Sequence, residues 1–179
     1  SDVCSSDLAE ITINGALEVP EESKIVIEPG AALYISNPTA VATIAGSIVV
    51  EDKDTKNSAA ILGVLQGSML ISGTVTVNGY MGVVGDDSIK TASVSVLEGG
   101  VLSIGKTGYL TVETYGSISI FGDSELYLAG SLNATNIYNA GTVTVNTSVP
   151  AAANSTIYQA ADDAVVDIQK FVVDKDGRT

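Results

Sequence analysis

The chain has 179 residues, enough for one domain with a substantial hydrophobic core. Its net charge is −13, it contains no histidine or tryptophan, and Arg178 is its sole arginine. This acidity argues strongly against nucleic acid and anionic membrane surfaces as partners, because both attract basic protein surfaces. No apolar run approaches the roughly 20 residues of a membrane span, so membrane insertion is not expected.

The N-terminal residues 1–10 are expected to be a non-native or disordered leader. Residues 1–8 resemble translated sequencing adapter, and no basic region followed by an apolar stretch marks a signal peptide here. The sole cysteine, Cys4, lies in this stretch. An intrachain disulfide is therefore not available to the fold.

The chain then repeats short apolar pairs, each with one residue between its two members. Apolar residues at positions i and i+2 lie on the same face of a β-strand, so each pair predicts a short strand with one buried face. In the most regular part the pairs recur every eight residues, and glycine precedes the first three of them. The predicted core ladder there consists of Leu102, Ile104, Leu110, Val112, Ile118, Ile120, Leu126 and Leu128.

These short strands can be connected in two ways. A meander of hairpins needs two-residue Asn-Gly or Asp-Gly turns, and such pairs occur only at residues 14–15, 78–79 and 176–177. A coil instead uses three eight-residue sides for a turn of about 24 residues, and successive turns stack as parallel strands. The sequence therefore predicts an all-β fold, a parallel β-helix (β-solenoid), over residues 11–149, with about six turns between Ile11 and Val145.

Two polar stretches, 51–57 and 85–88, interrupt the repeat and predict loops at corners of the coil. Their carboxylates, Asp52 and Asp54 in the first loop and Asp86 and Asp87 in the second, are candidate calcium ligands. The first loop lacks the central glycine and the distal glutamate of a calcium loop. A solvated loop is therefore favoured at both places, and calcium is the one cofactor that the sequence suggests.

Other chemistry in the sequence is sparse. Asn133, Asn146 and Asn154 each begin an Asn-x-Ser/Thr sequon and are candidate glycosylation sites. No catalytic residue is identified, since the chain lacks histidine and its one arginine is near the end. We therefore expect a protein that is not an enzyme.

Residues 150–179 differ in composition from the repeat. Apolar residues over 155–173 are spaced by three and four, as on one face of an amphipathic helix. The β-branched pairs at 165–166 and 172–173 favour an extended strand instead. A helix would cap the last turn, whereas an extended tail would link to the open edge of a neighbouring subunit. The candidate subunit contacts are Val165, Ile168, Phe171 and Val172.

The repeated units, such as Gly100 followed by the Leu102/Ile104 pair, resemble the right-handed parallel β-helix repeats of bacterial and archaeal surface proteins. These include adhesins, autotransporter passengers and pectate-lyase-like folds. The resemblance covers residues 11–146 and implies the architecture and an extracellular or cell-surface location. It implies no functional residue, because such repeats conserve core positions rather than a site.

Three classes of function are consistent with these features. The first is a non-enzymatic extracellular structural protein, a subunit that assembles with itself head to tail into a surface filament or coat. Its physical basis is that uncapped solenoid ends expose unpaired strand edges, and head-to-tail contacts produce open filaments. The alternative is an adhesin module that binds glycans or other surface proteins. The third is a polysaccharide lyase or hydrolase of the β-helix type.

Overall fold

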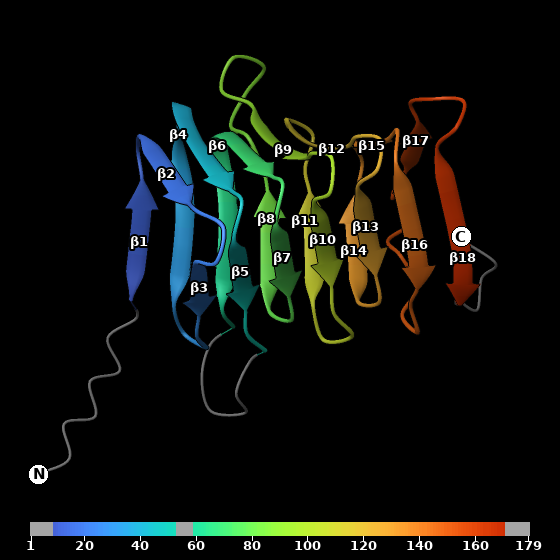
Figure 1. Ribbon diagram of the computed structural model, residues 1–179, viewed down its shortest axis with the longest axis horizontal. Coiled ribbons are helices and arrows are strands. Elements are labelled where there is room, and N and C mark those ends of the chain that lie inside the picture. Colours follow the sequence, from blue (N-terminus) through green and yellow to red (C-terminus); the bar gives the residue numbers. More distant parts are fainter. Residues whose placement is uncertain (1–8, 53–58, 171–179) are drawn as a thin grey trace, which may run out of the picture.

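The structure is a computed structural model that describes residues 9–52 and 59–170. Within these residues the chain forms eighteen β-strands and no helix. The strands stack side by side along the long axis of the molecule, from β1 at one end to β18 at the other (Figure 1). All pairs of neighbouring strands are parallel, which identifies the fold as a β-solenoid.

Each of the first six turns contributes strand residues to three faces. The first face contains β1 (Glu10–Ile13), the first half of β4 (Ala32–Ile44), the first half of β6 (Ile61–Ile71), β8 (Tyr80–Val83), β11 (Tyr109–Val112) and β14 (Ser131–Ala134). The second face contains β2 (Ala16–Val19), the second halves of β4 and β6, β9 (Ala92–Val96), β12 (Gly116–Ile120), β15 (Ile137–Asn139) and β17 (Ile157–Gln159).

The third face is a separate seven-stranded sheet. It contains β3 (Lys24–Ile27), β5 (Ser47–Val50), β7 (Thr74–Val77), β10 (Val101–Ile104), β13 (Glu125–Leu128), β16 (Thr142–Asn146) and β18 (Val165–Lys170). The long strands β4 and β6 run through a corner and join the first two faces into one 11-stranded sheet. The predicted three-sided coil is thus confirmed.

The turns have an average length close to the predicted one. The structure has about 6 turns of about 24 residues, as the sequence predicts. Individual turns vary, because corner loops differ in length: Glu125 pairs with Thr142, 17 residues later, whereas Ala32 pairs with Ile61, 29 residues later. The strands keep their inward and outward alternation despite these insertions, since variation is confined to the corners.

The hydrophobic core runs through the centre of the coil, between the three faces. All eight residues of the predicted ladder are buried in it. Pairing in register places them in columns, so that Leu102 lies between Val75 of the preceding turn and Leu126 of the following turn. Each turn therefore buries its apolar residues against its two neighbours, and a terminal turn has a neighbour on one side only.

Glycine allows the turns to approach closely at a corner. A Cβ atom added to Gly73 would lie 2.0 Å from the carbonyl oxygen of Gly46 in the preceding turn and 2.3 Å from that of Ala45. The Gly73 N–H donates to the carbonyl oxygen of Ile44 at 2.9 Å. No other residue fits this approach without a shift of backbone, which explains the glycine before the Val75/Val77 pair.

The C-terminal segment is extended, and the helix considered for 155–173 is wrong over its described part. Strand β17 pairs with β15, and β18 pairs with β16, opposite Val143 and Val145. Parallel strand pairing therefore continues beyond residue 149. The physical reason is that the open edge of β16 offers backbone partners to the β-branched residues Val165 and Val166, and a helix would leave those edge groups unpaired.

Candidate interfaces at the two ends of the solenoid

Two of the calcium candidates, Asp86 and Asp87, lie in the exposed loop between β8 and β9. Asp87 Oδ1 accepts hydrogen bonds from the N–H groups of Ile89 and Lys90, each at 2.8 Å. These two bonds lower the pKa of Asp87 below its ordinary value. The ammonium group of Lys90 lies 3.4 Å from Asp86 Oδ2. Both carboxylates thus bond within their own exposed loop.

The other two calcium candidates, Asp52 and Asp54, belong to the corner that follows β5. Asp52 lies two residues after the end of β5, and Asp54 lies outside the described residues. Among residues 9–52 and 59–170 no group of three or more carboxylate, cysteine or histidine side chains is placed to hold a metal ion.

The three sequon asparagines lie near the C-terminal end of the rod. Asn133 is half-buried on β14, and Asn154 is exposed in the segment before β17. Asn146 ends β16, and its Nδ2 donates to the Tyr127 hydroxyl at 3.2 Å and to Gln169 Oε1 at 3.3 Å. Asn154 is thus the most accessible of the three.

The first turn leaves the core open at the N-terminal end. Among the described residues, strands β1, β2 and β3 pair with other strands on one side only. Ile11, which starts the inward column of the first face, is 59% exposed, and Leu17 and Ile25 are half-buried. These residues line a hollow of about 350 Å³. Residues 1–8 of the predicted leader lie outside the described residues, whereas Ala9 lines the hollow and Glu10 begins β1.

Within the described residues, inward side chains are also exposed at the C-terminal end of the coil. Val166 and Ile168 continue the inward columns of Val143 and Val145, yet they are 46% and 63% exposed. Of the predicted subunit contacts, Ile168 therefore lies on this end. Val165 is also exposed there, on the outward side of β18. Phe171 and Val172 lie outside the described residues.

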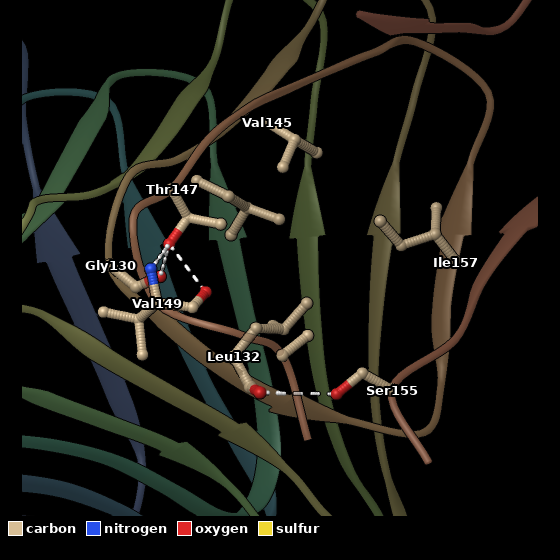
Figure 2. A pocket seen from close by; sticks show the side chains of 9 residues that line it. Gly130, Leu132, Val145, Thr147, Val149, Ser155 and Ile157 are labelled. Atoms are coloured by element: carbon tan, nitrogen blue, oxygen red, sulfur yellow. Dashed lines mark hydrogen bonds between the residues drawn. The ribbon is translucent and has the colours of Figure 1, made fainter. Parts of the chain in front are cut away.

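A second hollow, of about 150 Å³, opens beside this end on the first face. Leu132, Val145, Val149 and Ile157 surround it with apolar side chains (Figure 2). The nearby Thr147 hydroxyl donates to the carbonyl oxygen of Gly130 and accepts the N–H of Val149. Because the threonine hydroxyl is already bonded, the hollow is suited to an apolar side chain.

In the part of the chain that the structure describes, no strand covers β14, which leaves the hollow beside it. The segment 151–156 takes that place, with the Ala152 N–H donating to the Leu132 carbonyl oxygen at 2.9 Å and the Thr156 N–H to that of Ala134 at 2.8 Å. The Ala134 N–H donates to the Ser155 hydroxyl at 3.2 Å. The edge of β14 is therefore hydrogen-bonded, but small side chains such as Ala151 leave the space behind it unfilled.

Sequence reasoning did not identify Asn139, which fixes the start of the last strand. Its side chain is fully buried, with Nδ2 donating to the Val165 carbonyl oxygen at 2.9 Å and Oδ1 accepting the Gly141 N–H at 3.1 Å. It occupies the inward position two residues after Ile137, where the repeat predicts an apolar residue. The sequence signal is an asparagine at a position where the repeat has an apolar residue. A buried side chain of this kind needs hydrogen-bond partners, so it marks a specific contact.

The N-terminal contacts were also not identified as an interface, although the repeat contains the necessary signal. The first apolar pairs of a stacked array have no preceding turn to cover them, so Ile11, Leu17 and Ile25 had to be partly exposed. The same argument applies at the other end to Val166 and Ile168. Both ends thus expose apolar residues at inward positions.

Comparisons of the chain with protein-family models, with curated proteins and with solved structures find no match. Within the described residues there is no helix with the length and apolar character required to cross a membrane.

Proposed function

We propose that this protein is a non-enzymatic structural subunit that assembles with itself head to tail into an extracellular filament. One observation carries the proposal: the inward columns of apolar side chains have partly exposed members at both ends of the coil, whereas their members in the middle turns are buried. Ile11 and Ile168 are the most exposed members, at 59% and 63%. Burial of such side chains supports association by about 25 cal/mol for each Å² of apolar surface removed from water.

The geometry of the ends supports a filament rather than a closed dimer. Strand edges at β1, β2 and β3 belong to the start of the coil, and those at β17 and β18 to its finish. A contact between two different surfaces leaves one free surface at each end of every oligomer, so addition continues. The extracellular location rests on the resemblance of the repeats to those of surface proteins.

Pairs of stacked tyrosines favour a second candidate function, a glycan-binding adhesin module. The rings of Tyr80 and Tyr109 are 5.6 Å apart on the first face, and those of Tyr138 and Tyr158 are 5.3 Å apart on the second. Exposed tyrosine rings provide an apolar surface with a polar tip for contact with a partner. Glycan binding by chains that never assemble would support this function over the filament.

The test uses two variants, each blocked at one end. Ile11→Lys adds a charge to the N-terminal end, and Ile168→Lys adds one to the C-terminal end. Ser95→Lys, on an outward position of β9 in the middle of the rod, is the matched control. Electron microscopy at rising concentration should show filaments for the parent chain and for Ser95→Lys. Light scattering should show monomers for each blocked variant alone.

Mixing the two blocked variants gives the decisive result. Each retains one functional end, so an equimolar mixture should form a dimer of one copy of each and stop there. Circular dichroism of each variant checks that it is folded. A parent chain that stays monomeric at every concentration, or blocked variants that still form filaments, would contradict the proposal.

A further inference from the structure

We infer that the joint between two copies has a single register, in which β18 of one copy adds in parallel to β3 of the next, with Val166 opposite Ile25 and Ile168 opposite Ile27. This inference rests on the proposed head-to-tail assembly. It specifies the partner surface at residue level: the occupant of each open end is the opposite end of a second copy.

Continuity of the third face supports this pairing. Two inward columns run through all seven of its strands. The first column is Ile25, Ile48, Val75, Leu102, Leu126, Val143 and Val166, and the second is Ile27, Val50, Val77, Ile104, Leu128, Val145 and Ile168. Stacking β3 of the next copy on β18 adds one residue to each column. The two strands then pair in the same way as neighbouring strands inside the rod. The apolar surface exposed on Val166 and Ile168 is then covered.

A shift of one residue is excluded because side chains alternate between the two sides of a strand. It would move Val166 and Ile168 from the inward to the outward side relative to the partner. Only shifts by two residues keep apolar side chains inward, so these are the alternatives to consider.

Each shift by two residues loses part of the match. Placing Val166 opposite Ile27 brings Asp167 opposite Glu28, two like charges, and Ile168 opposite Pro29, which has no N–H to donate. Placing Ile168 opposite Ile25 leaves Ile27 facing residues 169–170, which are polar and follow an irregularity in the register of β18.

Charge supports the same register. With Val166 opposite Ile25, the outward residues Lys24 and Asp167 become diagonal neighbours across the joint. Diagonal positions are about 7–8 Å apart between strands, within reach of a lysine side chain. This pair adds an attraction between two chains that otherwise carry like net charge.

The order of faces gives the hollow beside Leu132 an occupant as well. In every turn the chain passes from the third face to the first, as from β3 to β4 or from β13 to β14. When β3 of the next copy stacks on β18, the first face of that copy lies over the first face of the preceding one. Ile11 begins the column that ends at Leu132. Its exposed side chain is therefore placed towards the 150 Å³ hollow.

Disulfide cross-linking between the two blocked chains tests the register. The Ile11→Lys chain carries Val165→Cys or Asp167→Cys, the Ile168→Lys chain carries Lys24→Cys or Val26→Cys, and Cys4→Ser removes the native thiol from both. Val165→Cys with Lys24→Cys represents the inferred register. The two shifted registers are represented by Val165→Cys with Val26→Cys and by Asp167→Cys with Lys24→Cys.

The expected result is that the first pair cross-links at least about tenfold faster than either shifted pair, because disulfides require Cα atoms within about 7 Å. Faster cross-linking of a shifted pair, or equal rates for all three, would overturn the single register while head-to-tail assembly stands. Absence of the dimer by light scattering before oxidation would overturn the proposed function, and this inference with it.

Discussion

Ile118 illustrates how a single residue supports the rod. It is fully buried on β12, between Val94 of the preceding turn and Ile137 of the following one. We expect Ile118→Asp to lower the free energy of unfolding by at least about 4 kcal/mol, because the core offers a carboxylate neither water nor a counter-charge. Thermal unfolding followed by circular dichroism measures this loss.

The matched control replaces carboxylates that lie outside the core. Asp86→Ala and Asp87→Ala remove side chains of the exposed loop between β8 and β9, whose hydrogen bonds are local. Their spectra and unfolding temperatures should stay close to those of the parent chain. An Ile118→Asp chain that unfolds at the parent temperature would contradict the column architecture of the core.

At the same scale, the limits of sequence reasoning are visible in Asn139. The alternation of apolar and polar residues was enough to place the eight ladder residues on inward positions, because that alternation is a local property of a strand. The partners of Asn139 are the carbonyl group of Val165, 26 residues away, and the N–H of Gly141. The first of these contacts depends on which strand is stacked next, and a local pattern carries no such information.

At the scale of the elements, the corners determine how closely the turns stack. Gly73→Ala should destabilise the fold by about 2–3 kcal/mol, because the new Cβ would meet two carbonyl oxygens of the preceding turn. Gly122→Ala is the control, since a Cβ there has no neighbour within 4 Å. It should leave stability unchanged or raise it by up to about 1 kcal/mol. Urea unfolding of both variants measures the difference, and equal effects would mean that the corner can widen freely.

The last strand shows why the form of the C-terminal segment could not be predicted from sequence. Spacings of three and four over 155–173 favour a helix, and the β-branched residues favour a strand, so local preferences are balanced. The edge of β16 decides between them, because it pairs with β18 in register from Thr142 opposite Val165. Where intrinsic preferences nearly cancel, the neighbouring strand determines the structure.

At the scale of the whole molecule, like charges oppose the proposed assembly. Each copy has a net charge of −13, and the described N-terminal turn contains Glu10, Glu18, Glu21, Glu22 and Glu28 with Lys24 as its one basic residue. The side chains of the joint are mainly apolar, so salt screening should act chiefly on the repulsion between copies. The Debye length falls from about 30 Å at 0.01 M salt to about 8 Å at 0.15 M.

We therefore expect the concentration at which filaments appear to fall several-fold when NaCl rises from about 0.01 to 0.15 M, because screening weakens the repulsion and leaves apolar burial intact. Sedimentation of filaments over a concentration series measures this threshold. The control is CaCl₂ at matched ionic strength, which should give the same threshold if general screening acts rather than calcium bridges between acidic ends. A threshold that rises with NaCl would show that ion pairs such as Lys24 with Asp167 outweigh the apolar columns, and would contradict the joint as argued from Val166 and Ile168.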